Sequence, residues 1–409
     1  MDGRDATTAH MELRPDEAQE EMLLKWVTDK CAKHQAFGLD EGWEKIQEHG
    51  VAVVQRVLVQ WLSSKHEACT EVAPLSRKCW SSLYTISYNM CSLAGVNDLS
   101  ADVYDRYNAS IRGFLRERVA PRLAAAPQNE LVDETVRMWE QHKVLVSWMH
   151  RLFMHLDRGL VEHHRLSTLT SCGLACFRPE ALEPEARRLR DTALAAVESD
   201  REAMGQDRGV QEGLRALTAA LVEVGICASN EELTDVNSLS KVDQDLGVYE
   251  QVLGEPLVEA SRVHYARWVQ RMVEELSPAE YVSEVNALLR EEQARAELYL
   301  KGTTGQRIRE VVIETAVAST QAQVLGRPVG GFKDLLVREQ LDSVEEMFKL
   351  YSVVEEALQP MADMLAQSVV ERGYAVLRKG EAKLKQLGVH LSSGSGGEDA
   401  TGGGGGGGG

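Results

Sequence analysis

Five histidines that lie close together give this sequence its clearest potential for metal chemistry: His142, His150, His155, His163 and His164. Metal ligands must converge on one point, and on a helix they usually do so from positions i and i+4 of one face. At roughly 100° per residue, His142, His150 and His155 point about 40°, 120° and 260° away from Met138. Because these directions diverge and no carboxylate completes the set, the five histidines are predicted to be structural or surface residues.

Other motifs that could carry chemistry are incomplete. Cys172 and Cys176, in "CGLAC", have helical spacing, but no second cysteine pair lies nearby to complete a zinc site. The stretch "HEACT" at His66 lacks the second histidine of a metalloprotease motif. The chain contains no phosphate-binding loop, no G-x-S-x-G elbow and no G-x-G-x-x-G fingerprint. The sequence therefore predicts a non-catalytic protein with no catalytic residues, no metal site and no cofactor.

Composition narrows the class of partner. The 409 residues carry a formal net charge of −18, which repels phosphate backbones, so nucleic-acid binding is not expected. No apolar run reaches the roughly 18 residues of a membrane helix, and the first residues have no apolar signal core, so neither a membrane nor a secretory role is expected. The seven cysteines are scattered and odd in number. They predict reduced thiols in the cytoplasm and nucleus.

Along the chain, apolar residues mostly recur at helical spacing, and patterns typical of strands are nearly absent. The histidines, cysteines and aromatic residues are therefore expected to lie on helices. Ser277, Pro278 and Glu280 form a capping box at the start of one predicted helix. Helices joined by short turns favour an all-α fold built as an elongated, solenoid-like stack, in which each helix pair buries its apolar face against the next. The glycine-rich end, from Ser392, cannot bury anything and is predicted to be a disordered tail.

Two predicted helices carry more apolar surface than one interface requires. In and just before "WSSLYTISYNMCS", residues 80–92, one stripe consists of Cys79, Leu83, Ile86 and Met90. Another consists of Trp80, Tyr84, Tyr88 and Cys91, with Ser87 among them. Over residues 137–158 a core stripe is flanked by further apolar side chains on both sides; the stripe consists of Met138, Leu145, Met149, Leu152, Phe153 and Leu156. The second stripe of residues 80–92 could lie between neighbouring helices, or it could form a docking surface together with a flank of the 137–158 helix.

Several stretches, in order from about Gly42 to Val376, resemble the N-terminal region of cullins, and most closely the plant-type cullin that scaffolds F-box (SCF) ubiquitin ligases. "GWEKIQ", "LYTISYNMC", "VYDRYNASIRGFL" and "WEQHKVLVSWMHRLFMHLDR" resemble the first cullin repeat, and "GLACFR" and "LVEVGI" resemble the second. The most specific match is "YVSEVNALLREEQARAELYLKGTT", residues 281–304, with Glu284, Glu291, Glu292, Arg295 and Tyr299 in register.

The resemblance implies a stalk of five-helix cullin repeats. It divides the chain into an N-terminal extension (1–38), repeat one (39–165), repeat two (166–276), a partial repeat three (277–390) and the tail (391–409). It also implies that the second and fifth helices of repeat one hold a BTB/POZ-fold adaptor, which carries an F-box protein. The adaptor-binding residues would be Trp80, Tyr84, Ser87, Tyr88, Val136, Met138, Gln141 and His142.

The sequence departs from the family pattern at several positions. Ser81 stands where an apolar residue is usual, Trp80 replaces the aromatic neighbour, and Gly159 replaces an aromatic residue. Leu253 and Leu257 stand where phenylalanines are usual. The C-terminal region of cullins, which recruits the RING protein and carries the lysine that a ubiquitin-like protein modifies, has no counterpart here, so RING binding is not expected.

Three functional hypotheses remain open at the level of the sequence. The first is a non-catalytic scaffold of an SCF-type ubiquitin ligase in ubiquitin-dependent protein degradation. The second is a truncated competitor that sequesters adaptors. The third is a helical scaffold of a tethering or trafficking complex, against which the residues in register at 281–304 argue.

Overall fold

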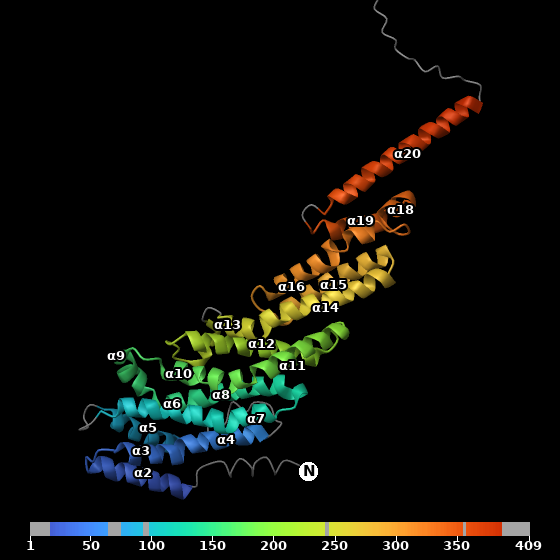
Figure 1. The fold of residues 1–409 in the computed structure, drawn as a ribbon. Coiled ribbons are helices and arrows are strands. Elements are labelled where there is room, and N and C mark those ends of the chain that lie inside the picture. Colours follow the sequence, from blue (N-terminus) through green and yellow to red (C-terminus); the bar gives the residue numbers. More distant parts are fainter. Residues whose placement is uncertain (1–16, 64–74, 93–97, 242–244, 355–356, 387–409) are drawn as a thin grey trace, which may run out of the picture. The chain divides into compact units, whose positions relative to one another are not determined.

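The computed structural model describes residues 17–63, 75–92, 98–241, 245–354 and 357–386, and every regular element within these ranges is helical (Figure 1). The predicted all-α class is therefore confirmed. The predicted tail, residues 391–409, lies outside the described residues, as does His66. The predicted repeat boundaries remain predictions.

The described residues group into two compact units, one within Met1–Tyr265 and Leu288–Val312 and the other within Ala266–Ala287 and Ile313–Gly409. Two of the three divisions fall inside long helices, α14 (Glu255–Glu275) and α15 (Pro278–Tyr299), and the third follows Val312. The other helices of the first unit are α2 (Glu17–Ala32), α3 (Leu39–Ile46), α4 (Ala52–Ser63), α5 (Arg77–Cys91), α6 (Ser100–Phe114), α7 (Ala120–Ala125), α8 (Leu131–Phe153), α9 (Glu162–His164), α10 (Leu169–Ala175), α11 (Glu183–Glu202), α12 (Arg208–Ser229), α13 (Gly247–Tyr249) and α16 (Thr304–Val312).

Short π-helical and 3₁₀ turns extend or join these helices. In the first unit they are η1 (Gln47–Val51), η2 (Leu115–Val119), η3 (Gln128–Glu130), η4 (Asp157–Val161), η5 (Arg178–Leu182), η6 (Val236–Lys241) and η7 (Glu250–Gly254). The second unit adds η8 (Ile313–Ala318), α17 (Gln321–Leu325), α18 (Phe332–Val337), α19 (Leu341–Tyr351) and α20 (Gln359–Gln386).

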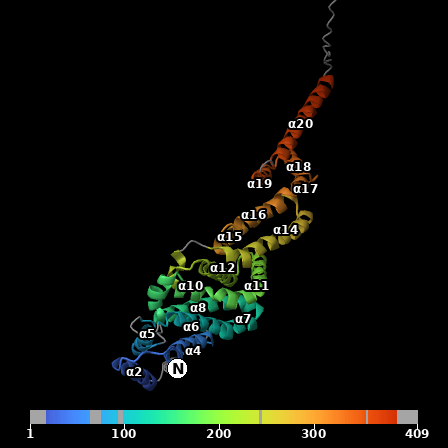
Figure 2. The same cartoon turned by 60° about the vertical axis from the view of Figure 1, so that its left-hand side comes forward.

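Helix α8 is the centre of packing in the first unit. It contacts α4 and α5 through some of its faces and α10, α11 and α12 through others, and the layers follow one another in chain order (Figure 1, Figure 2). Its wide apolar arc is explained by this double packing, because a helix between two layers must be apolar on more than one side. The predicted core stripe is confirmed, since every member is buried: Met138, Leu145, Met149, Leu152, Phe153 and Leu156.

Two glycines lie where helices of the first unit come too close together for a larger side chain. A Cβ on Gly42 would come within 2.3 Å of Met90 Sδ, so only glycine lets α3 pack this closely against α5. A Cβ on Gly173 would lie 2.9 Å from the hydroxyl of Tyr107 and 3.1 Å from Val146, so α10 approaches α6 and α8 in the same way. Both contacts hold the first unit's helices at short separation.

Helix α15 begins as predicted and contributes a buried ionic network. Ser277 and Glu280 exchange the hydrogen bonds of a capping box: the Ser277 amide donates to Glu280 Oε2, and the Glu280 amide donates to Ser277 Oγ. Further along α15, within the first unit, Arg295 pairs with Glu292 at 2.9 Å and with Asp200 of α11 at 3.2 Å. Arg201 pairs with the same Glu292 at 3.3 Å.

Candidate docking surface

Helix α5 presents one buried face and one accessible face. It begins at Arg77 because Ser76 Oγ accepts a hydrogen bond from the Cys79 amide, which satisfies one free donor of the first turn. Leu83, Ile86 and Met90 are buried, so the predicted inward stripe is confirmed. The second stripe does not lie between helices along its whole length, because the Tyr88 side chain is 50% exposed.

The aromatic side chains of that second stripe stack on one another. The ring centroids of Trp80 and Tyr84 lie 5.4 Å apart with planes inclined by 19°, and those of Tyr84 and Tyr88 lie 6.1 Å apart at 18°. His155, which follows the end of α8, meets both tyrosines edge-on with centroids 5.7 Å away in each case. We call Trp80, Tyr84, Tyr88 and His155 the aromatic ladder. Offset and edge-on arrangements of this kind stabilise ring pairs by about 1 kcal/mol beyond burial.

A groove of about 520 Å³ opens beside the aromatic ladder. Among the residues that line it are Tyr84, Tyr88, His155 and Gly159. A Cβ on Gly159 would touch nothing within 4 Å, so this position lies open on the groove. In the described part of the chain the hydroxyls of Tyr84 and Tyr88 take part in no hydrogen bond. Each is therefore available to a partner, as polar tips of aromatic residues are at interfaces.

His155 is held neutral within the ladder. Burial lowers its pKa to about 4, against the opposing effects of Ser87 and Asp157. Ser87 is fully buried, and its Oγ lies 3.4 Å from His155 Nε2. The predicted site residue Ser87 therefore contacts the ladder through His155 on its buried side and is not exposed to a partner. At neutral pH the ladder presents an uncharged, aromatic surface.

The other predicted site residues lie elsewhere on α8. Met138 and His142 are buried, and His142 Nε2 is 2.9 Å from the carbonyl oxygen of Gly173 in α10. At about 1.5 Å per residue, His142 is about 20 Å along the helix from His155, which meets α5. The end of α8, and not the part with Val136, Met138, Gln141 and His142, therefore adjoins Tyr84 and Tyr88. Adaptor binding by these four residues remains a prediction. Val136 and Gln141 are half-buried on that first part of the helix.

Sequence reasoning missed His155 as a member of this surface. The 100° step of a regular helix does not give its direction, because α8 ends at Phe153 and Met154 forms a turn. The usable signal was the spacing of Trp80, Tyr84 and Tyr88, which placed three aromatic rings on one face of α5.

The described residues contain no group of three or more histidine, cysteine or acidic side chains that could hold a metal ion. Cys172 and Cys176 are free thiols, and burial raises the pKa of Cys172 to about 12, which keeps it protonated and unreactive. Within the helices that the structure describes, none is both long and apolar enough to cross a membrane.

Comparison with known proteins points to one family. The family model described as the cullin alpha solenoid domain matches residues 60–390, a range that includes α5 and α8. "Putative cullin-like protein 1" of Arabidopsis thaliana is 26% identical over 83% of this chain and 43% of its own length. "Cullin-1" of Oryza sativa subsp. japonica is 24% identical over 85% of this chain and 43% of its own length.

A shorter relative aligns along most of its length. "Putative cullin-like protein 2" of Arabidopsis thaliana is 24% identical over 87% of this chain and 87% of its own length. The chain otherwise spans less than half the length of the longer curated relatives that it matches.

Proposed function

The chain belongs to the cullin family, and from this premise we propose that it is a non-catalytic scaffold of a ubiquitin ligase of the SCF type. In this proposal the aromatic ladder and the groove beside it hold a BTB/POZ-fold adaptor, and the adaptor carries an F-box protein that selects the substrate. The protein acts in the cytoplasm and nucleus in ubiquitin-dependent protein degradation. It contributes position, and no chemical step.

The observation that carries the docking proposal is the half-exposed stack of Trp80, Tyr84 and Tyr88 beside an open groove. Tryptophan and tyrosine are the residues that most often dominate binding energy at protein interfaces. Here each ring stacks on its neighbour, and the two tyrosines also contact His155, so docking costs little side-chain entropy. The surface is also neutral, which suits a hydrophobic anchor from the partner better than a charged one.

The test is co-purification and titration of an F-box adaptor with the full chain. Tyr84→Ala combined with Tyr88→Asp should weaken adaptor binding at least about 30-fold, since loss of a central aromatic residue costs about 2 kcal/mol or more. Gly159→Trp should weaken it comparably by filling the groove, and because a Cβ there meets nothing, the helices should remain folded.

Arg215→Trp provides the matched control for added bulk, because Arg215 is an exposed residue on α12, outside the ladder groove. This variant should bind the adaptor like the wild-type chain. If the wild-type chain binds no adaptor at micromolar concentration, the docking proposal fails and the tethering hypothesis gains. If it binds adaptor but supports no ubiquitin transfer together with the remaining ligase subunits, the protein is a competitor that sequesters adaptors.

A further inference from the structure

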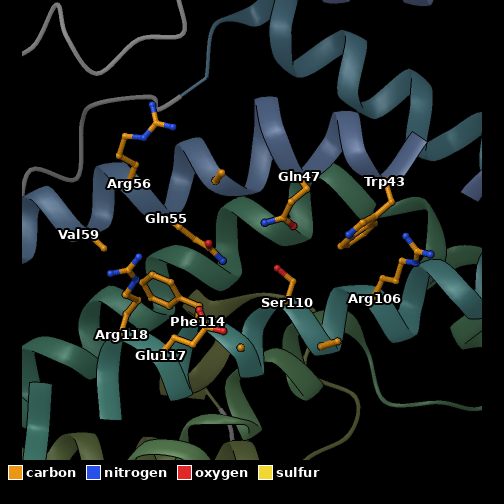
Figure 3. A pocket seen from close by; sticks show the side chains of 13 residues that line it. Trp43, Gln47, Gln55, Arg56, Val59, Arg106, Ser110, Phe114, Glu117 and Arg118 are labelled. Carbon is orange, nitrogen blue, oxygen red and sulfur yellow. The ribbon is translucent and has the colours of Figure 1, made fainter. Parts of the chain in front are cut away.

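A second groove, of about 660 Å³, lies in the first unit between two helical walls (Figure 3). One wall runs from α3 through η1 to α4, and the other from α6 into η2. In Figure 3, Trp43 and Arg106 lie toward one end of the groove, and Phe114 and Arg118 lie toward the other. This groove shares no lining residue with the groove beside the aromatic ladder, so the two are separate surfaces.

The groove contains polar side chains without partners. Gln47, Gln55 and Ser110 are half-buried on its walls, and their side chains make no hydrogen bond to another residue in the described part of the chain. A glutamine amide offers both donors and an acceptor, and a serine hydroxyl offers one donor and accepts as well. An extended peptide backbone presents alternating N–H and C=O groups that such side chains can satisfy.

The charge of the groove is opposite to that of the whole protein. Its lining includes Arg56, Arg106 and Arg118, against the single carboxylate of Glu117, whereas the chain carries a net charge of −18. Arg106 pairs with Asp40, but Arg56 and Arg118 have no ion pair with any residue that the structure describes. Guanidinium groups bind carboxylates in a fixed, two-pronged geometry, so these residues favour an acidic occupant.

An apolar surface inside the groove offers a place for one hydrophobic side chain. Trp43 is held by stacking on Phe153, with ring centroids 5.8 Å apart, and Phe114 is largely buried on the opposite wall. The wall from Arg106 to Arg118 is about 18 Å long at about 1.5 Å per residue. An extended chain advances about 3.3 Å per residue, so about six residues span the groove.

We propose that this groove binds an extended acidic segment of a partner protein, about six residues long and with one apolar side chain among its carboxylates. The carboxylates pair with Arg118 and Arg56. The apolar side chain packs on Trp43, at the end of the groove away from Arg118, and the peptide backbone pairs with Gln47, Gln55 and Ser110. Binding is weakened by salt, because the arginines that attract the segment are exposed at the rim.

The probe is a library of phage-displayed random peptides selected on the intact chain, followed by fluorescence anisotropy with the enriched peptides. We expect enrichment of peptides rich in Asp and Glu with one Leu, Ile, Phe or Met. Arg118→Glu should weaken their binding about tenfold or more, because it replaces an attraction with a repulsion. Gly113→Trp should abolish binding, since Gly113 lines the groove and a Cβ there meets nothing within 4 Å.

Arg215→Glu, on α12, is the matched control for the change of charge and should leave the affinity unchanged. Selection of peptides without acidic residues would overturn the proposal. Acidic peptides that bind Gly113→Trp and Arg118→Glu as tightly as the wild-type chain would overturn it as well. Because Arg118 is exposed on the helix surface, loss of binding in that variant cannot be a folding defect when its helical circular dichroism is unchanged.

Discussion

Among single residues, His142 shows most clearly how burial sets the chemistry of a side chain in this protein. It lies between α8 and α10, where Nε2–H donates to the Gly173 carbonyl, and Nδ1 is buried with no hydrogen-bond partner among the described residues. Burial lowers its pKa to about 4, although hydrogen bonds to the backbone of Gly173 and Leu174 act in the opposite direction. The residue is therefore a neutral core histidine, as the diverging histidine directions predicted, and it is not free to contact a partner.

This burial predicts a dependence of stability on pH. Because the folded pKa of His142 is about 4 and the unfolded value is about 6.5, the unfolded chain binds more protons between these values. The stability is fully present above about pH 6.5 and falls as the pH drops toward 4. From pH 7 to pH 5 the loss should be about 2 kcal/mol from this residue.

Urea unfolding at pH 7 and pH 5 measures this effect. His142→Gln keeps a donor for the Gly173 carbonyl but has no titrating ring, so this variant should lose about 2 kcal/mol less than the wild-type chain between the two pH values. Equal losses in both proteins would show that His142 does not titrate as its burial requires.

At the scale of elements, a buried ionic network joins α11 to α15. Its residues on α15 belong to "LLREEQARAELY", part of the stretch that resembles cullins most specifically. Arg295 reaches Asp200, and Glu292 accepts from both Arg201 and Arg295. Burial acts to raise the pKa of Glu292, but the two neighbouring arginines outweigh it and lower the pKa below its usual value. Glu292 is therefore charged at neutral pH and holds two buried guanidinium groups.

Removal of that charge should be costly. Glu292→Gln leaves Arg201 and Arg295 with one buried carboxylate fewer, and breaking a buried pair in this way costs about 3 kcal/mol or more of unfolding free energy. Glu291 pairs with the same Arg295 at 3.2 Å, but its side chain is 42% exposed. Glu291→Gln is therefore the matched control and should cost at most about 1 kcal/mol.

Chemical denaturation of the two variants at neutral pH decides between these outcomes. A similar small loss in both would mean that the network contributes little and that apolar packing alone joins α11 to α15. A large loss only in Glu292→Gln would identify the network as a main link between these helices.

At the scale of the whole molecule, helix α20 carries an exposed apolar surface that few folded proteins tolerate. Six of its large apolar side chains are exposed by 46% or more: Leu365, Val369, Val370, Tyr374, Val376 and Leu377. Repeat helices rely on neighbours for burial, and an exposed apolar surface of this kind promotes association. The chain is therefore expected to self-associate or to bind chaperones.

Static light scattering at rising protein concentration measures this tendency. The apparent mass of the wild-type chain should rise with concentration, whereas Val369→Glu combined with Leu377→Glu should keep it near the monomer value of 45.3 kDa. Val263→Glu, at a singly exposed valine of α14, is the control and should behave like the wild-type chain. A wild-type chain that stays monomeric throughout would contradict the prediction.

Local periodicity was sufficient to predict the helices and their buried faces. Leu83, Ile86 and Met90 on α5 are buried as their spacing requires. The same holds for the stripe of Met138, Leu145, Met149, Leu152 and Phe153 on α8, continued by Leu156 after its end. Such patterns are readable because each helix repeats its faces every 3.6 residues, whatever it packs against. The capping box at Ser277 and Glu280 was readable for the same reason, since its hydrogen bonds are local.

The sequence by itself determined the all-α class, the buried stripes and the aromatic face of α5. Only the tertiary structure decided that the end of α8, with His155, meets Tyr84 and Tyr88, and that Met138 and His142 point into the core. It alone also brought Trp43 and Arg118 to one groove. The physical reason is that contacts between distant segments depend on where helices end and cross, and no local period encodes those positions.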